Sequence, residues 1–213
     1  MIFEKINNLI IFSANNRKKV FTVGRYGAKI TMEKVGVDME IGVSSSCFYP
    51  ELIEKSLETV GHLGAKTAEI FFNSPCELEG KILKELCRIK DYYGIQIRSV
   101  HPFTSGYEPY LIFSNYSRRT NDSIDFYKRY FAAANELGAE LVVLHGGRDR
   151  KGYTPELYAE NYIKLHNEAR KSNLFIAQEN VNNFYCSDPY IMKKIADAVG
   201  DGFRMVLDIK QCR

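Results

Sequence analysis

Short apolar runs alternate with longer amphipathic segments along most of the chain. The run Asn173 to Val181 is too short for a stable helix and suits a buried surface, so it predicts a strand inside a parallel sheet. In Leu78 to Tyr93, apolar residues recur at helical spacing, and Gly94 follows as a helix end. Because strands and helices alternate without hairpin signals, the pattern predicts a parallel sheet with helical connections.

From Glu40 onward this alternation predicts six strands and five helices. The strands are expected at 40–44, 67–72, 95–101, 140–145, 173–181 and 203–208. The helices are expected at 50–63, 78–93, 123–137, 154–172 and 188–200. An eight-unit barrel needs roughly 30 residues per unit, so Glu40 to Arg213 has room for about six units. The predicted fold class is therefore α/β, a (β/α)8 TIM barrel truncated after the sixth strand, with an irregular N-terminal extension.

The first 38 residues do not follow the alternation. They contain two β-like pieces, around Val20 to Val23 and Ala28 to Thr31, and predict either a small hairpin or an arm that packs little against the rest. Met39 is an alternative natural start, because the regular pattern begins there. The chain is accordingly divided into an extension, 1–38, and a barrel, 39–213.

Composition and charge narrow the class of protein. The chain has 213 residues, 45% of them hydrophobic, which is enough for a substantial core. Its five scattered cysteines include no C-x-x-C pair, which argues against a disulfide framework or a thiolate zinc site and favours the cytoplasm. The net charge is +3, but the extension alone carries +4, with seven Lys or Arg against three Asp or Glu. The barrel is thus slightly acidic, which disfavours a nucleic-acid partner.

The sequence contains no apolar run of the roughly 20 residues that a membrane span requires, so no membrane partner is expected. The oligomeric state is left open, with a homo-oligomer as one alternative.

Four of the predicted strands end in residues that can bind a metal: His101, His145, Glu179 and Asp208. The carboxyl ends of parallel strands meet at one rim, where a barrel places its chemistry. Imidazole and carboxylate groups are suitable ligands for a divalent metal that polarises a carbonyl or phosphoryl oxygen. Any one of these residues alone is more often a hydrogen-bonded structural group, but the joint pattern favours a site.

The loop after the third predicted strand, Phe103 to Tyr116, is long and aromatic. It suits either a lid over the pocket or filler between strand and helix, and both alternatives stay open.

Six motifs resemble, in chain order, the first six strands of the xylose-isomerase-like TIM barrels. They are Ile-Gly-Val-Ser-Ser, Ala-Glu-Ile-Phe-Phe, Val-His-Pro-Phe, Val-Leu-His-Gly-Gly, Gln-Glu-Asn-Val and Val-Leu-Asp-Ile-Lys-Gln. That superfamily includes sugar and sugar-phosphate isomerases and epimerases as well as apurinic-site endonucleases. The resemblance runs from about Met39 to Arg213.

The epimerase branch implies a metal held by Glu on strand five, Asp on strand six, His on strand seven and Glu on strand eight. Glu179 and Asp208 match the first two, and the last two would lie beyond Arg213. The resemblance makes Glu179 both a metal ligand and the proton-transferring base. It places His101 and His145 near the substrate, together with Gln211, which stands where His is common and can bind a sugar hydroxyl.

The implied function is that of a metal-dependent sugar or sugar-phosphate isomerase or epimerase, with Mn, Mg, Co or Zn as cofactor. In the endonuclease branch, His101 and His145 instead match zinc ligands. That branch is disfavoured because the first strand ends Val-Ser-Ser-Ser without its His, Gln211 replaces a ligand, and the barrel is slightly acidic. The alternatives are therefore a zinc phosphodiesterase of the apurinic-site type, or an inactive truncated barrel.

Overall fold

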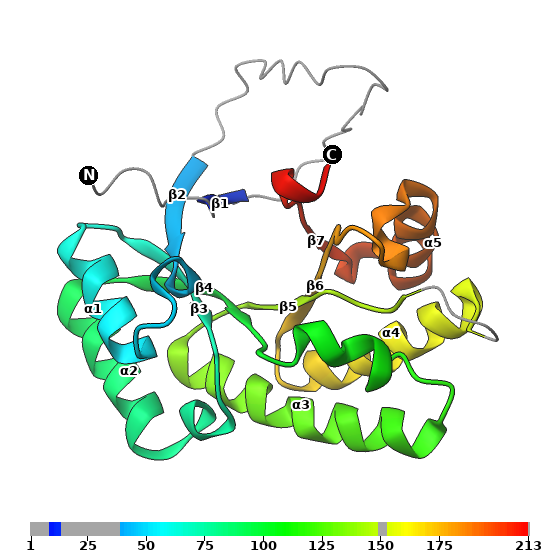
Figure 1. The fold of residues 1–213 in the computed structure, drawn as a ribbon, viewed down its shortest axis with the longest axis horizontal. Coiled ribbons are helices and arrows are strands. Elements are labelled where there is room, and N and C mark those ends of the chain that lie inside the picture. Colours follow the sequence, from blue (N-terminus) through cyan, green and yellow to red (C-terminus); the bar gives the residue numbers. More distant parts are fainter. Residues whose placement is uncertain (1–8, 14–38, 149–152, 213) are drawn as a thin grey trace.

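The computed structural model describes residues 9–13, 39–148 and 153–212. Six parallel strands follow one another in chain order and form a curved sheet, with the helices around its outside (Figure 1). The parallel strands are β2 (Met39–Ser44), β3 (Thr67–Phe71), β4 (Gln96–His101), β5 (Leu141–Leu144), β6 (Phe175–Glu179) and β7 (Arg204–Val206). This is the strand order and connection of a TIM-barrel-like fold, as the sequence predicts.

Five α-helices connect these strands. They are α1 (Ile53–His62), α2 (Gly80–Tyr93), α3 (Ser117–Leu137), α4 (Pro155–Lys171) and α5 (Pro189–Val199). Thr154 and Asp188 cap α4 and α5 through their side-chain oxygens, and a proline follows each cap. The predicted six strands and five helices are therefore confirmed in the described ranges 39–148 and 153–212, with ends that shift by a few residues.

The largest shift concerns α3, which begins at Ser117 although the apolar pattern predicts a start near Ser123. Its first turns are polar in sequence, but Thr120 is buried there. The Thr120 hydroxyl donates hydrogen bonds to the carbonyls of Ile112 and Ser114. Because a hydroxyl rather than an apolar side chain anchors this end, hydrophobic periodicity cannot reveal it.

A seventh strand, β1 (Leu9–Ser13), lies within the N-terminal extension and pairs with β2 in antiparallel orientation. Its register runs from Leu9 opposite Val43 to Ser13 opposite Met39. The expectation that the extension packs little against the rest is therefore wrong for these five residues, because the edge of β2 offers unpaired backbone groups to another strand. The β-like pieces predicted at 20–23 and 28–31 lie outside the described residues.

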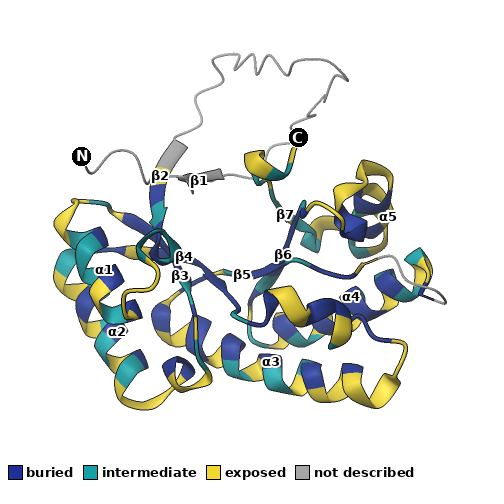
Figure 2. Ribbon diagram, viewed as in Figure 1, coloured by how far each residue is buried: buried dark blue, intermediate teal, exposed yellow. Residues whose placement is uncertain are grey.

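Among the described residues, a large hydrophobic cluster lies between the sheet and the helices, and a second, smaller cluster contains Val181, Phe184, Cys186 and Met192 (Figure 2). Helix α2 illustrates the origin of the large cluster, since Leu83, Leu86 and Ile89 recur on one helical face and are buried. Gly94 ends this helix with a positive φ of 64°, the left-handed conformation that glycine adopts most readily. None of the described helices is both long and apolar enough to cross a membrane.

Truncation of Leu57 tests this packing. Its side chain is 0% exposed, and Leu57→Ala is expected to lower the free energy of unfolding by about 2–5 kcal/mol. Leu63, directly after the same helix, is 54% exposed, so Leu63→Ala should change it by less than about 0.5 kcal/mol. Urea unfolding of both variants measures the difference, and equal losses would contradict the assignment of this core.

Candidate metal centre

Three ionisable side chains converge at the carboxyl ends of neighbouring parallel strands. His101 is the last residue of β4, His145 directly follows β5, and Glu179 is the last residue of β6. Glu179 Oε2 lies 3.0 Å from His145 Nε2 and 3.5 Å from His101 Nε2. The two imidazole nitrogens are 3.1 Å apart. Each residue thus offers one ligand atom, and the three atoms lie within 4.8 Å of one another.

This donor set fits a divalent metal ion. Two imidazoles and one carboxylate suit zinc or another divalent transition metal, and three protein ligands leave positions open for a substrate. The carbonyl oxygen of Pro102 lies 3.3 Å from His101 Nδ1 and can only accept, so Nδ1 carries a proton there. In the neutral ring, His101 Nε2 is then the unprotonated nitrogen, as a metal ligand requires.

The cluster is largely buried, which strengthens its electrostatic interactions. Burial raises the pKa of Glu179, but hydrogen bonds and charge from His101 and His145 outweigh it and lower that pKa to about 2. Burial alone would lower the pKa of His101, but its hydrogen bond to Glu179 and the charges of Glu69, Glu179 and Glu108 raise it. Without a metal, Glu179 is therefore held as a carboxylate between the two rings.

Aromatic rings fix the orientation of both imidazoles. Phe71 stacks on His101, with ring centroids 4.5 Å apart and planes inclined by 25°. Phe184 contacts His145 edge-on at a centroid distance of 6.0 Å. Both contacts limit rotation of the rings, which keeps the ligand atoms together.

Two glycines shape the loop that carries His145. Gly146 has a positive φ of 93°, and a side chain there would collide with the hydroxyl of Tyr158. A Cβ at Gly147 would lie 2.9 Å from Cβ of Phe113. Gln178 holds the same loop by donating to the carbonyls of Leu144 and His145. In the His-Gly-Gly motif, the two glycines therefore allow the backbone to pack closely against Tyr158 and Phe113, and the histidine joins the cluster.

Glu69, on β3, is a buried carboxylate near the cluster that the sequence analysis did not single out. Its oxygens accept hydrogen bonds from Ser44 Oγ at 2.8 Å and Ser99 Oγ at 3.1 Å. Burial raises its pKa, and the charge of His101 opposes this rise. The sequence pattern could have identified Glu69, because a glutamate between apolar neighbours in a predicted buried strand needs a hydrogen-bond or charge partner.

Glu108, in the short 3-10 helix η4 (Ser105–Tyr110), is a second buried carboxylate that sequence reasoning missed. It is 0% exposed and accepts hydrogen bonds from Tyr127 Oη and Gly146 N, both at 2.6 Å. Burial raises its pKa to about 7, against the lowering effect of His145. No periodic pattern marks Glu108, since the loop around it is irregular.

Asp208 follows β7 at the same end of the sheet as Glu179, but it lies outside the three-residue cluster. Its Oδ1 accepts a hydrogen bond from the backbone N–H of Lys210. The Asn180 side chain bonds both the N–H and the carbonyl of Asp208. Gln211 Oε1 accepts from the backbone N–H of Asn182. In this structure the side chains of Asp208 and Gln211 thus bond backbone groups in the segments that follow β7 and β6. The role of Asp208 as a metal ligand and the role of Gln211 in substrate binding stay predictions.

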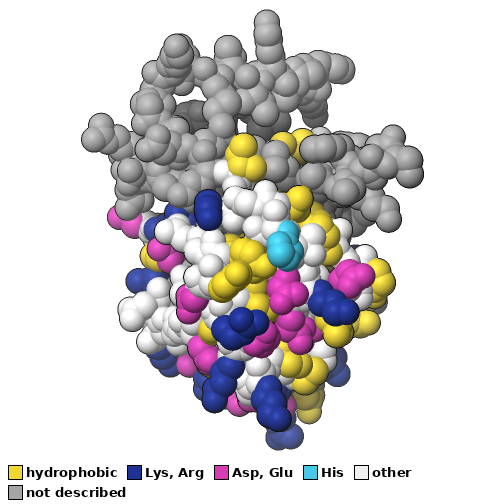
Figure 3. Space-filling model, turned by 90° about the vertical axis from the view of Figure 1, so that its left-hand side faces the viewer, with side chains coloured by type: hydrophobic (Ala, Val, Ile, Leu, Met, Phe, Trp, Pro, Cys, Tyr) yellow, Lys and Arg dark blue, Asp and Glu magenta, His cyan; other side chains and the backbone are white. Residues whose placement is uncertain are grey.

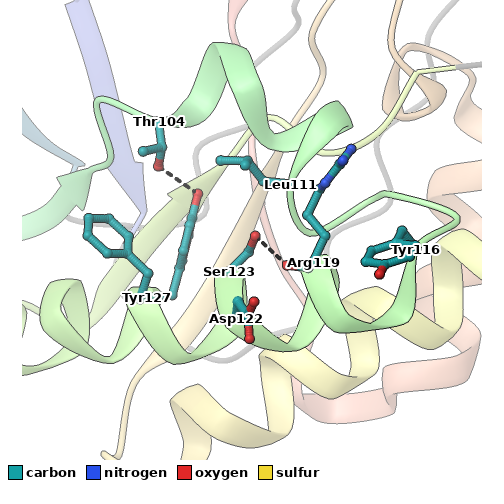
Figure 4. Close-up of a pocket in the computed structure, with 8 residues that line it drawn as sticks. Thr104, Leu111, Tyr116, Arg119, Asp122, Ser123 and Tyr127 are labelled. Carbon is teal, nitrogen blue, oxygen red and sulfur yellow. Dashed lines mark hydrogen bonds between the residues drawn. The ribbon is translucent and has the colours of Figure 1, made fainter.

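A cavity of about 480 Å³ lies between η4 and α3, and none of the three cluster residues lines it (Figure 4). Tyr127 lines it and accepts a hydrogen bond from Thr104 Oγ1 at 3.3 Å. The other lining residues are Leu111, Tyr116, Arg119, Asp122, Ser123 and Phe126. The aromatic loop predicted as lid or filler thus packs onto α3, and its residues Thr104, Leu111 and Tyr116 line the open cavity there.

The chain belongs to the xylose isomerase-like TIM barrel family, whose model matches residues 57–212. Solved structures of similar fold include a D-tagatose 3-epimerase-like protein, with a TM-score of 0.67 and 22% identity, covering 80% of this chain and 65% of that one. A sugar phosphate isomerase/epimerase from Parabacteroides distasonis has a TM-score of 0.60 and 18% identity, covering 80% and 65%. D-psicose 3-epimerase has a TM-score of 0.62 and 13% identity, covering 78% and 62%.

A curated relative is an uncharacterized protein of Methanocaldococcus jannaschii, 32% identical over 127 residues. That match covers 60% of this chain and 40% of the relative. The chain thus spans less than half of this relative, and about two thirds of the similar solved structures. At these identities the structural likeness establishes the fold, and the activity has to be argued from the site.

The pKa of Glu179 gives a testable pH dependence. This pKa is lowered to about 2 from 4.5, so the unfolded chain takes up this proton first as the pH falls. The stability that the Glu179 carboxylate contributes is present above pH 4.5 and is lost as the pH falls toward 2. In Glu179→Gln that loss should be missing, which gives a flatter acid limb in urea unfolding measured with a chelator present. Parallel acid limbs in the two proteins would contradict this.

Proposed function

We propose that this chain carries the site of a metal-dependent sugar or sugar-phosphate isomerase or epimerase. The observation that carries the proposal is the convergence of His101, His145 and Glu179 at the rim of a xylose isomerase-like sheet. The names of similar structures support the substrate class, since they include epimerases of small sugars and a sugar phosphate isomerase/epimerase. The reaction is transfer of a proton at the carbon next to a carbonyl.

His101, His145 and Glu179 are proposed as the ligands of a divalent ion such as Mn, Mg, Co or Zn. Such an ion supplies Lewis-acid polarisation of the substrate carbonyl. This assignment moves the two histidines from the substrate, where the resemblance places them, to the metal. Their nitrogen distances to the Glu179 carboxylate support the change.

The role of Glu179 as base needs a further condition. A carboxylate with a pKa of about 2 is a weak base, because general bases work best with a pKa near the operating pH. The geometry therefore favours Glu179 as ligand first. Its role in proton transfer depends on how a bound cation and substrate change its contacts with the two rings.

A zinc phosphodiesterase of the apurinic-site type is the second candidate. One observation favours it: both histidines lie against Glu179, as the zinc-ligand match of that branch implies. The charge distribution speaks against it. On the described part of the face in Figure 3, Lys and Arg side chains are mixed with Asp and Glu side chains rather than gathered in a positive stripe.

Solvent deuterium exchange tests the proposal. The protein is incubated with manganese and a panel of ketoses and ketose phosphates in deuterated water, and deuterium is expected at the carbon beside the carbonyl. In Glu179→Gln the nearly isosteric amide ligates a cation poorly and cannot accept a proton. The rate should fall by about 10² to 10⁴ if proton transfer is lost.

Glu77→Gln is the matched control, because Glu77 is also buried but accepts hydrogen bonds from the backbone N–H groups of Asn73 and Ser74, away from the cluster. Its exchange rate should match that of the unaltered protein. Cleavage of abasic DNA without deuterium in any sugar would decide for the phosphodiesterase.

A further inference from the structure

Glu108 is a fully buried carboxylate that joins three parts of the fold beside the proposed metal site. It comes from η4, accepts a hydrogen bond from Tyr127 on α3, and accepts another from Gly146 in the loop after β5. Gly146 is the residue after His145. Fixing the Gly146 N–H therefore fixes the backbone from which the His145 ring reaches Glu179.

The Glu108 carboxylate has a second effect, on the charge balance of the proposed metal site. Two neutral imidazoles and the Glu179 carboxylate provide one negative charge, whereas a divalent cation carries two positive charges. The charge of Glu108 acts on both His101 and His145, although Glu108 lies outside the ligand cluster. In a buried environment such an interaction is only weakly screened.

The hydrogen bonds alone do not account for a glutamate here. A glutamine could accept from Gly146 N–H through its carbonyl and donate to Tyr127 Oη through its amide, because a phenol oxygen both donates and accepts. A glutamine would also avoid the cost of burying a carboxylate. What glutamate adds over glutamine at this position is an ionisable carboxylate close to the two histidines. Burial raises its pKa to about 7, so it is only partly ionised in the metal-free protein near neutral pH, and a divalent cation bound at the histidines would favour its negatively charged form.

We propose that Glu108 is a positioning residue of the cation site, which holds His145 in place through Gly146 and whose negative charge raises the affinity for a divalent metal ion. The inference rests on the metal site of the proposed function but not on the sugar chemistry. Glu108 touches neither the ion nor the substrate, so it acts through the ligands.

Metal affinity is the direct test. Calorimetric titration of the metal-free protein with Mn²⁺ and with Zn²⁺ should show Glu108→Gln binding about 10- to 100-fold more weakly, the usual loss when a partner of a ligand is removed. Glu77→Gln, which alters a buried carboxylate in η3 (Pro75–Leu78), should leave the affinity unchanged. Equal affinities in Glu108→Gln and the unaltered protein, or no binding of either ion to the unaltered protein, would overturn the proposal.

The Tyr127→Phe variant separates the effect of the Glu108 charge from the effect of the hydrogen bond that Tyr127 donates to it. It removes one hydrogen bond to Glu108 but keeps the carboxylate, so the melting temperature should fall while the metal affinity stays within about threefold. A loss as large as that of Glu108→Gln would show that packing, not charge, sets the affinity, and would overturn the proposal.

If Glu108→Gln does not fold, Glu108→Asp replaces it. That change keeps the charge but draws it back from Gly146 by one methylene, and should weaken binding by a smaller factor, about 3- to 10-fold. Unchanged affinity in this variant would overturn the proposal.

The outcomes also separate this inference from the proposed function. Weakened metal binding in Glu108→Gln without deuterium exchange in the unaltered protein rejects the sugar chemistry alone. Exchange in the unaltered protein with equal metal affinity in Glu108→Gln rejects only the role of Glu108.

Discussion

The ionic contact between Glu179 and the two histidines is the interaction on which the rest of the site depends. Three parallel strands deliver these side chains to one rim, and each strand contributes a single ligand atom. A carboxylate this deeply buried is costly unless it is paired. His101 and His145 provide the partners, and a divalent cation bound to their Nε2 atoms would take the place of the imidazole protons beside Glu179. The charge pattern of the rim therefore suits both a metal-free and a metal-bound state.

The sequence predicts that these three side chains meet because the prediction depends on strand ends, although of the three it assigns only Glu179 to the metal. His101, His145 and Glu179 each close a short apolar run, and parallel strands in chain order bring successive carboxyl ends together. Short motifs at these strand ends indicate the family, and helical spacing predicts the five helices, with ends marked by proline or glycine. Local rules are sufficient here because each of these features is specified within a few residues of sequence.

The parts that sequence reasoning misses depend on contacts between distant segments. Glu108 is paired by Tyr127 and Gly146, which lie 19 and 38 residues away. The early start of α3 depends on the Thr120 hydroxyl, and β1 is placed by the free edge of β2. For Asp208, the strand-end rule identifies the correct end of the sheet but not the direction of the carboxylate, which bonds the following turn.

The way the His145 loop is held has a consequence for how substitutions act across the molecule. Tyr158 lies on α4, outside the sheet, and bonds Gln178, which bonds the carbonyl of His145. Its hydroxyl also occupies the space that a side chain at Gly146 would need. A change at position 146, 158 or 178 therefore alters which residues the other two positions tolerate, although none of the three belongs to the His101, His145 and Glu179 cluster.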